Sequence, residues 1–381
     1  MKKILVTGGA GNIGSSLVKG LLKTERYHIS IVDNLSTGSK ANLPQINESH
    51  WEFINCDVNT LDQLKKVFKK NSFHYIFHYA ALVGVERTQK NPLKVLEDIE
   101  GIKNILNLAV EFNAERIFYS SSSEVYGEPV EIPQNEITTP LNSKLPYAIV
   151  KSVGESFMRT FHEHHQLDFT IMRFFNTYGP RQKNDFVISK FIELALQNKD
   201  ITIYGDGSQT RSFLHVDDNV EFTIHILEKK KLLNEVVNVG SDIEITIIDL
   251  ANLIIKILKS QSNIIFLPPL KEGDMTRRKP DTIANTHKHV NSWWSACYYL
   301  QDESEINLEK DIPQIYVNPT VSTRLNGLAR TIKAKKGTLL VFPSEVLHTP
   351  VLHEKNLRYS LAMNFMPLGI VGEGDSTYEY R

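Results

Sequence analysis

An apolar run that breaks into a glycine-rich turn limits the fold of this chain more than any other feature of its sequence. Residues 3–14 read Lys-Ile-Leu-Val-Thr-Gly-Gly-Ala-Gly-Asn-Ile-Gly, and helical periodicity follows. This order predicts a strand, a tight turn and a helix. Glycines let backbone N–H groups approach a pyrophosphate, and the helix N-terminus adds the positive end of its dipole. The segment therefore predicts a dinucleotide site at Gly8, Gly11, Asn12, Ile13 and Gly14.

A carboxylate follows at the distance that dinucleotide-binding folds require. A second apolar strand, residues 27–33, ends at Asp33, about twenty residues beyond the glycine turn. Asp33 can accept hydrogen bonds from both ribose hydroxyls of NAD, and it would repel the 2′-phosphate of NADP. The pattern predicts NAD as the cofactor.

Composition excludes several classes of partner. The chain has 381 residues, of which 41% are hydrophobic and 23% charged, and its formal net charge is −1. This length predicts two domains, and the charge balance favours neither nucleic acid nor a membrane surface as a partner. No apolar stretch approaches the ~20 residues of a membrane helix. The two cysteines, Cys56 and Cys297, lie far apart, and the chain begins directly with a strand, so we expect a cytoplasmic protein.

Strands alternate with amphipathic helices through the first half of the chain. This alternation predicts an α/β fold, a Rossmann-type doubly wound parallel sheet covered on both faces. The expected strands are 3–7, 27–33, 51–55, 75–79, 116–120 and 169–174, and the most distinct helices are 93–112 and 147–164. We assign residues 1–175 to this domain. Residues 176–285, where loops lengthen, form a smaller substrate lobe interleaved with it.

The pattern changes to short β-type runs after residue 285. Runs at 293–300, 314–317, 337–342 and 357–365 follow one another with few helical stretches. We expect an all-β domain over 286–371 and a loose tail over 372–381.

Catalytic chemistry is indicated by Tyr147-Ala-Ile-Val-Lys151. The spacing places a phenol and an ammonium one helical turn apart on one face. A tyrosine is a poor base near neutral pH, but the ammonium of Lys151 and an oxidised nicotinamide both favour the phenolate. Tyr147 could then accept a proton from a substrate hydroxyl. A run of serines, residues 120–123, ends the fifth strand and could position that hydroxyl.

Residues 1–285 resemble the extended short-chain dehydrogenase/reductases of the NAD-dependent nucleotide-sugar epimerase/dehydratase group. The matching motifs, in the family's order, are 8–14, 33–38, 57–58, 78–81, 121–127, 147–151, 175–181, 204–213 and 277–281. The resemblance implies a homodimer formed through helices 93–112 and 147–164. It assigns catalysis to Tyr147, Lys151, Ser122 and Glu124. It adds Asn34, Asp57, Val58, Ala80 and Ala81 to the NAD site. It assigns binding of the substrate's diphosphate to Asn176, Arg211 and Arg277 or Arg278.

The resemblance implies oxidation of the sugar at C4, and it leaves the fate of the 4-keto sugar open. Ser123-Glu124 resembles the order in UDP-glucuronate decarboxylases and GDP-mannose dehydratases, but many epimerases of the group share it. Two departures stand out. Asp98 occupies a position where the family often has asparagine. The closing helix that family members have after Asp281 is replaced by a different segment.

That segment, about 287–367, resembles the iron(II)/2-oxoglutarate-dependent oxygenases. Their double-stranded β-helix binds Fe(II) through an early His-x-Asp or His-x-Glu pair and a later histidine. An arginine about ten residues beyond that histidine binds 2-oxoglutarate. The corresponding residues are His287, His289, His348 and Arg358, with His289 in place of the carboxylate.

Three functions follow from the two resemblances. The first is a nucleotide-sugar epimerase or dehydratase acting through a 4-keto sugar, either a UDP-glucuronate decarboxylase-like enzyme or a 4-epimerase. The second is an oxygenase to which the Rossmann part presents a nucleotide sugar. The third is a non-catalytic fusion that binds NAD and nucleotide sugar.

Overall fold

The computed structural model divides into two compact units, Met1–Thr282 and Ile283–Arg381. It describes residues 1–45, 49–268 and 277–280, and beyond them the backbone of short strands between residues 294 and 380. Within these residues no helix combines the length and the apolarity needed to cross a bilayer.

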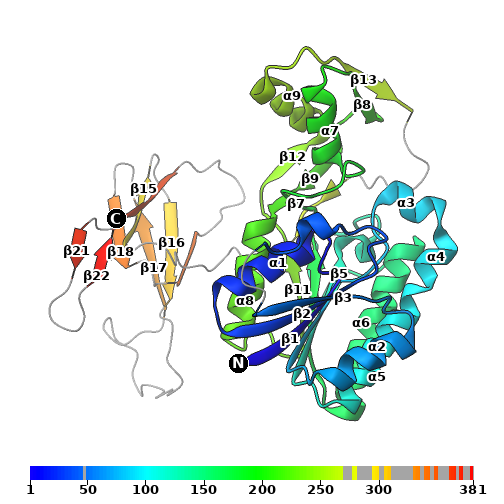
Figure 1. The fold of residues 1–381 in the computed structure, drawn as a ribbon. Coiled ribbons are helices and arrows are strands. Elements are labelled where there is room, and N and C mark those ends of the chain that lie inside the picture. Colours follow the sequence, from blue (N-terminus) through cyan, green and yellow to red (C-terminus); the bar gives the residue numbers. More distant parts are fainter. Residues whose placement is uncertain are drawn as a thin grey trace. The chain divides into compact units, whose positions relative to one another are not determined.

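A seven-stranded sheet forms the centre of the first unit, in the order β11-β6-β5-β4-β1-β2-β3 (Figure 1). All of its strand pairs are parallel. The strands are β1 (Lys2–Thr7), β2 (Tyr27–Asp33), β3 (Trp51–Asn55), β4 (Tyr75–His78), β5 (Arg116–Ser122), β6 (Asp168–Phe174) and β11 (Glu235–Val239). The first six confirm the expected parallel sheet. The seventh was not predicted, because its short run lies in the part of the chain assigned to the lobe.

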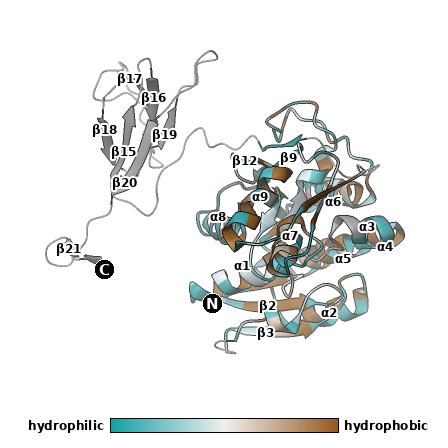
Figure 2. Ribbon diagram, turned by 90° about the horizontal axis from the view of Figure 1, so that it is seen from above, coloured by the Kyte–Doolittle hydropathy of each residue, from teal (hydrophilic) through white to brown (hydrophobic). Residues whose placement is uncertain are grey.

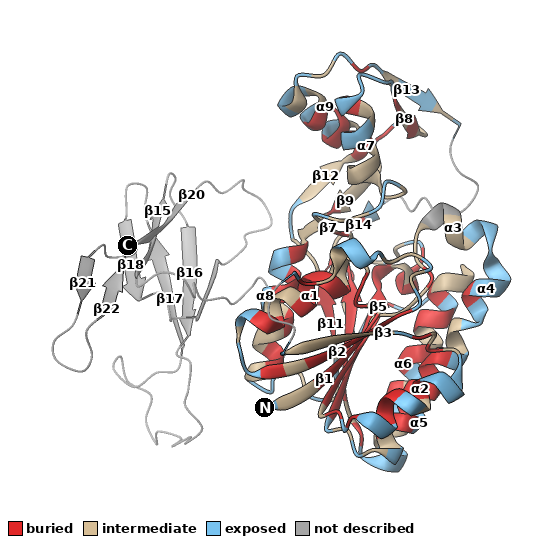
Figure 3. Ribbon diagram, viewed as in Figure 1, coloured by how far each residue is buried: buried red, intermediate tan, exposed pale blue. Residues whose placement is uncertain are grey.

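Helices cover both faces of this sheet, as the alternating pattern predicts. Helices α1 (Asn12–Lys23) and α8 (Val216–Glu228) pack on one face, and α2 (Leu61–Lys70), α5 (Asp98–Glu111) and α6 (Pro146–His165) pack on the other. Along β1, Leu5 belongs to one apolar core, and Ile4 and Val6 belong to the other. Figure 3 shows the buried strands between the helices, and Figure 2 shows hydrophobic and hydrophilic residues alternating along the helices.

The helix expected over 93–112 is divided in two. The first part is α4 (Pro92–Leu96), which follows α3 (Val85–Lys90), and the second part is α5. Between α4 and α5 the chain makes a turn at Glu97, so that Asp98 becomes the first residue of α5. The helix expected over 147–164 is α6, which begins at Pro146, a residue that suits the first helical turn.

Residues in the second half of the unit form a smaller lobe. Its core joins α7 (Val187–Leu196) and α9 (Ile247–Leu258) to the parallel pair β8 (Ile201–Tyr204) and β13 (Ile264–Leu267). A second small sheet has the order β12 (Glu244–Thr246), β9 (Thr210–Ser212) and β14 (Arg277–Arg278). The pair β7 (Thr177–Tyr178) and β10 (Leu214–His215) completes the lobe's strands among the described residues.

The second unit contains antiparallel strands. One group is β18 (Leu339–Pro343), β15 (Trp294–Tyr299) and β20 (Ser360–Phe365), and another is β17 (Ala329–Ala334), β16 (Ser304–Glu309) and β19 (Leu347–Pro350). A last pair joins β21 (Gly369–Val371) to β22 (Tyr378–Tyr380), which lies in the expected tail. The run expected at 314–317 lies outside the described residues. Strands β16, β17, β19, β21 and β22 were not predicted.

Candidate active site

The glycine turn lies between β1 and α1, at the carboxyl edge of the parallel sheet. Gly8 has a φ of +67°, and a Cβ built there would lie 2.7 Å from the backbone nitrogen of Ala80. A Cβ at Gly14 would collide with the carbonyl oxygen of Gly8. Only glycine therefore permits the close approach of the turn to the end of β4. The turn ends where α1 begins, directly after Gly11.

Asp33 is held in place by the backbone around it. Its Oδ2 accepts a hydrogen bond from the backbone N–H of Ala10 at 3.0 Å, and its Oδ1 accepts one from Leu35 at 2.8 Å. At the end of the next strand, Asp57 Oδ2 accepts a hydrogen bond from Asn34 Nδ2 at 2.9 Å. These contacts fix two carboxylates beside the glycine turn with lone pairs still able to accept from hydroxyl groups.

A cavity of about 980 Å³ opens at this edge of the sheet. This volume is at the upper end of the range usual for ligand sites. Every residue predicted to bind NAD lines it: Gly8, Gly11, Asn12, Ile13, Gly14, Asp33, Asn34, Asp57, Val58, Ala80, Ala81, Tyr147 and Lys151. Ser122, Glu124, Asn176 and Arg278 line it as well. The glycine turn, the helix N-terminus and the fixed carboxylates fit a dinucleotide with a diphosphate and ribose hydroxyls.

Lys151 is buried beneath the catalytic end of this cavity. Its Nζ donates to the carbonyl oxygen of Ser120 at 2.6 Å and lies 5.7 Å from the ring centroid of Tyr147. Burial lowers the pKa of Lys151 to about 8, and the carboxylate of Asp98 opposes that shift. Asp98 itself accepts a hydrogen bond from the backbone N–H of Leu82 at 2.7 Å.

The surroundings of Tyr147 keep its phenol protonated in the protein alone. Burial raises the pKa of Tyr147 well above its usual range, and the carboxylates of Glu124 and Asp98 add to this shift. A hydrogen bond with Ser122 and the charge of Arg278 act in the opposite direction. The spacing of Tyr147 and Lys151 gives no sign of the two carboxylates, which lie on other elements of the chain.

Ser122 lies where β5 passes into the short 3-10 helix η2 (Ser123–Tyr126). Its Oγ accepts a hydrogen bond from the backbone N–H of Glu124 at 3.2 Å. The serine therefore both caps η2 and reaches Tyr147. This arrangement joins three of the predicted catalytic residues through one hydroxyl group.

Glu124 forms a two-point ion pair with Arg278 of β14. Arg278 Nη2 donates to Glu124 Oε2 at 2.6 Å, and Nη1 donates to Oε1. Arg278 is 3% exposed, and its buried Nε has no hydrogen-bond partner in the described structure. The sequence motifs predict separate roles for the two residues, in catalysis and in substrate binding, and their contact was not predicted.

The other residues predicted to bind the substrate do not all lie in the cavity. Asn176 lines the cavity and donates from Nδ2 to the carbonyl oxygen of Ser212 at 2.9 Å. Arg277 is exposed on β14 and pairs with Glu244 at 2.6 Å. Arg211 lies beside Arg278 in the register of β9 and β14. Neither Arg211 nor Arg277 is among the described residues that line the cavity.

Two further arginines line the cavity and were not predicted. Arg181 donates to the hydroxyl groups of Ser15 and Ser16 on α1, at 3.2 and 2.7 Å. Arg87 also lines the cavity and pairs with Asp185 at 2.6 Å. Arg181 ends the 175–181 motif, so the sequence contained a signal for it.

The residues predicted to bind iron and 2-oxoglutarate belong to the second unit. His287, His289 and Arg358 lie outside the described residues. His348 lies on β19, where its backbone is paired with Leu308 of β16. Among the described residues, no three His, Cys, Asp or Glu side chains are grouped so that they could hold a metal ion.

Comparison with known proteins identifies both parts of the chain. The family model described as "NAD dependent epimerase/dehydratase family" matches residues 4–240, and the model described as "Putative 2OG-Fe(II) oxygenase" matches residues 275–364. Residues 275–282 of the second match lie in the first structural unit. The two matches confirm the two resemblances read from the sequence.

Individual relatives match most of the chain's length. UDP-glucuronic acid decarboxylase 6 of Arabidopsis thaliana is 34% identical over 319 residues, which are 82% of this chain and 87% of that protein. The crystal structure of UDP-glucose 4-epimerase with UDP-glucose from Thermotoga maritima has a TM-score of 0.70 and 31% identity, covering 74% of this chain and 91% of that one. UDP-glucose 4-epimerase of Thermus thermophilus, in complex with NAD, has a TM-score of 0.68 and 27% identity, covering 74% of this chain and 91% of that one.

Proposed function

The chain belongs to the NAD dependent epimerase/dehydratase family, and we propose that it is an NAD-dependent enzyme that decarboxylates a nucleotide hexuronate through a 4-keto sugar. NAD, when bound, supplies the hydride acceptor and later the hydride donor, together with a positive charge that favours the phenolate of Tyr147. The glycine turn, Asp33 and Asp57 hold the cofactor. No NAD is consumed over a full turnover, since the hydride leaves C4 and returns to C4.

Tyr147 acts as the base in this proposal. Its phenolate accepts the proton of the C4 hydroxyl, and Ser122 holds that hydroxyl by a hydrogen bond. Lys151 lies below the ring and is anchored to the carbonyl oxygen of Ser120, which keeps a positive charge near the phenolate. After the sugar is converted, Tyr147 returns the proton to the C4 oxygen.

We base the choice of substrate on the Glu124–Arg278 ion pair in the cavity wall. A guanidinium fork matches a carboxylate in two-point geometry. A hexuronate has a carboxylate at C6, two bonds from C4, and a neutral hexose does not. Arg278 is buried, carries an unpartnered Nε, and acts on Tyr147 electrostatically. A substrate carboxylate would give this guanidinium a second anionic partner.

The chemistry then balances without a further reagent. A ketone at C4 makes the C6 carboxylate a β-keto acid, whose C5–C6 bond breaks to release carbon dioxide. The electron pair of that bond forms the C4–C5 enolate, and C5 takes up a proton. A water molecule that the Glu124 carboxylate orients supplies that proton from solvent. Return of the hydride to C4 gives the nucleotide pentose.

Product analysis tests this proposal against the 4-epimerase alternative. Purified protein is incubated separately with UDP-glucuronate, UDP-glucose and their GDP and dTDP counterparts, and products are identified by mass and NMR. We expect loss of carbon dioxide from the hexuronate and a pentose product. An unchanged mass with inversion at C4 of a neutral hexose would instead establish epimerisation. Retained NAD with no conversion of any sugar would support the non-catalytic fusion.

The match at 275–364 favours a second candidate activity for the C-terminal part. We propose that it folds as a double-stranded β-helix and holds Fe(II) through His287, His289 and His348, with Arg358 binding 2-oxoglutarate. Imidazole groups suit Fe(II). Metal analysis of the full chain after anaerobic loading with Fe(II), and succinate release that depends on 2-oxoglutarate, test it. Full metal binding in a His348→Ala variant would contradict the assignment.

Helices α4, α5 and α6 support the proposal of a homodimer. Helix α4 packs against α6, and Leu93, Leu96 and Ile149 are exposed on these two helices, Leu93 to 79%. Large exposed apolar side chains gathered on neighbouring helices are typical of an interface between copies. Sedimentation analysis of the wild type and a Leu93→Glu variant tests this. If the wild type and the variant were both monomeric, the dimer would be contradicted. The cytoplasmic location of the protein stays a prediction.

A further inference from the structure

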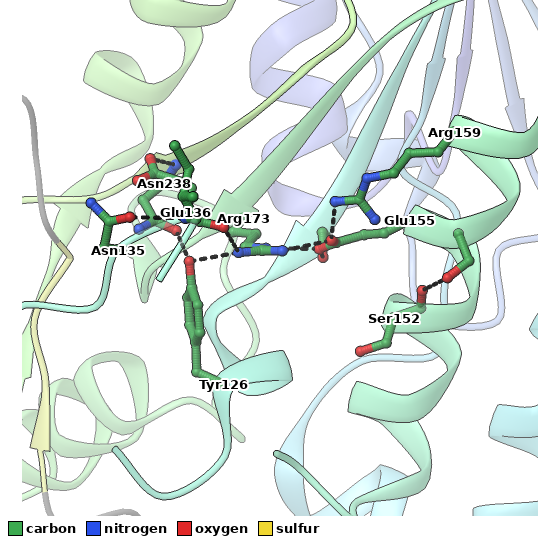
Figure 4. A network of polar contacts seen from close by, with 11 residues as sticks. Tyr126, Asn135, Glu136, Ser152, Glu155, Arg159, Arg173 and Asn238 are labelled. Carbon is green, nitrogen blue, oxygen red and sulfur yellow. Dashed lines mark hydrogen bonds and ion pairs between the residues drawn. The ribbon is translucent and has the colours of Figure 1, made fainter. Parts of the chain in front are cut away.

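Glu155 is a fully buried carboxylate for which the sequence analysis gave no role. It lies on α6 and is 0% exposed. Its Oε1 accepts hydrogen bonds from Ser121 Oγ at 2.6 Å and Arg173 Nε at 2.9 Å, and its Oε2 accepts one from Arg173 Nη2 at 2.7 Å. Figure 4 shows Arg173 of β6 aimed at Glu155. Arg159 Nη2 also donates to Glu155 Oε2, at 3.4 Å.

The partners of Glu155 are the immediate neighbours of the catalytic residues. Tyr147, Lys151 and Glu155 recur every four residues along α6, so they lie along one side of the helix. Ser121 directly precedes Ser122 on β5. One carboxylate thus joins the helix that carries the base to the strand that carries its serine partner.

Arg173 extends the same network to the segment that carries Glu124. Its Nη1 donates to the hydroxyl of Tyr126 at 2.8 Å, and that hydroxyl donates to Asn238 Oδ1 at 2.7 Å. Tyr126 ends η2, two residues after Glu124. Figure 4 shows this chain of contacts passing from α6 through β6 to η2.

Stability alone does not require such a pair. Exchanging a buried ion pair for apolar side chains of similar volume is often neutral or stabilising. A buried pair does, however, fix geometry, because each charge must keep its partners. Here the fixed elements are the three that carry Tyr147, Ser122 and Glu124.

We propose that Glu155 is a positioning residue for the reaction, acting through Ser121 to hold Ser122 against Tyr147 and through Arg173 and Tyr126 to hold η2. The kinetic effect that this inference predicts depends on the proposed function. Glu155 touches neither substrate nor cofactor, since it is not among the described residues that line the cavity. Its effect is on the distance between catalytic groups.

The Ser121→Ala variant tests the link to β5 without unpairing the buried charges. It removes one hydroxyl and leaves the bonds between Glu155 and Arg173. We expect kcat to fall about tenfold and KM to stay within about twofold, because small misplacements of catalytic groups lower the rate of the chemical step. The matched control is Ser156→Ala, an exposed serine on α6 that donates to Ser152 O at 3.2 Å. It should behave as the wild type.

The pH profile distinguishes positioning from a general structural effect. The charged groups that face Tyr147 are Lys151 on its own helix, Glu124 from η2, Asp98 from α5 and Arg278 from β14. None of these changes in Ser121→Ala. A weaker bond from Ser122 removes one influence that lowers the pKa of Tyr147. The acid limb of the kcat profile should therefore move to higher pH.

Crystal structures of the wild type and Ser121→Ala give a readout that needs no turnover. We expect the distance between the Ser122 and Tyr147 oxygens to be greater in the variant than in the wild type. Unchanged kcat, pH profile and oxygen separation would overturn the inference. An inactive wild type would overturn the proposed function, and the oxygen separation would still decide the role of Glu155.

Discussion

Lys151 lies under Tyr147 with its ammonium nitrogen 5.7 Å from the ring centroid and hydrogen-bonded to the carbonyl oxygen of Ser120. The ammonium is therefore held by β5 beside the ring of Tyr147. The phenol of Tyr147 is buried beside charged groups. Its ability to act as the base of the reaction therefore depends on the balance of their charges. Four single substitutions test the roles of residues at this site.

Replacing Tyr147 by phenylalanine removes the base and preserves the ring. We expect kcat to fall by about 10²- to 10⁴-fold, the usual contribution of a positioned general base. NAD should remain bound, because the glycine turn and Asp33 are untouched. Product formation and the NAD content of the purified variant are the two measurements. Undiminished turnover would refute the assignment of Tyr147.

Asp98→Asn examines the residue that departs from the family pattern. The carboxylate of Asp98 raises the pKa of Tyr147 and that of Lys151. Neutralising it lowers both pKa values, so the phenolate forms at lower pH and Lys151 loses its charge at lower pH. The whole kcat profile should move to lower pH. The amide oxygen can still accept from Leu82 N–H, and a profile that stays in place would show that Asp98 has only a structural role.

Arg278→Lys examines recognition of a sugar carboxylate. Lysine keeps a positive charge beside Glu124 but loses the two-point geometry. We expect the Kd for UDP-glucuronate to rise about tenfold, as for a lost hydrogen bond to a charged group, and the Kd for UDP-glucose to change less than about twofold. Calorimetry of the NAD-loaded protein measures both. Equal weakening of both ligands would place Arg278 at the diphosphate, the role that the sequence resemblance gave it.

Local sequence patterns predict the parts of the site that are local in the chain. The turn from Gly8 to Gly14 and the helical spacing of Tyr147 and Lys151 each occupy one element, and both are found in the structure as expected. The six predicted strands are apolar runs, and their hydrophobic periodicity and their length identify them as strands. Such patterns depend only on neighbours in the sequence.

Contacts between distant elements are what the sequence does not contain. Glu124 and Arg278 are 154 residues apart and meet because β14 pairs with β9 in the register Arg278 to Arg211. Strand β11 lies in the part of the chain that the sequence pattern assigns to the lobe, and its place in the large sheet is decided by parallel pairing with β6. The turn at Glu97 lies inside a continuous helical pattern, and Asp98 in the next position binds Leu82.

Gly8→Ala tests whether the turn requires glycine for its backbone conformation. Gly8 has a φ of +67°, and its added Cβ would lie 2.7 Å from the backbone nitrogen of Ala80. A non-glycine residue in this left-handed conformation costs roughly 1–2 kcal/mol, and the contact with backbone atoms adds to that cost. We expect the free energy of unfolding of the NAD-free protein to fall by about 2 kcal/mol, and NAD content to fall with it. The control is Gly11→Ala, because Gly11 has a φ of −78° and its Cβ would lie 3.2 Å from Gly8 O. Denaturant unfolding of both variants measures the difference; equal losses would mean that the conformation of Gly8 carries no special cost.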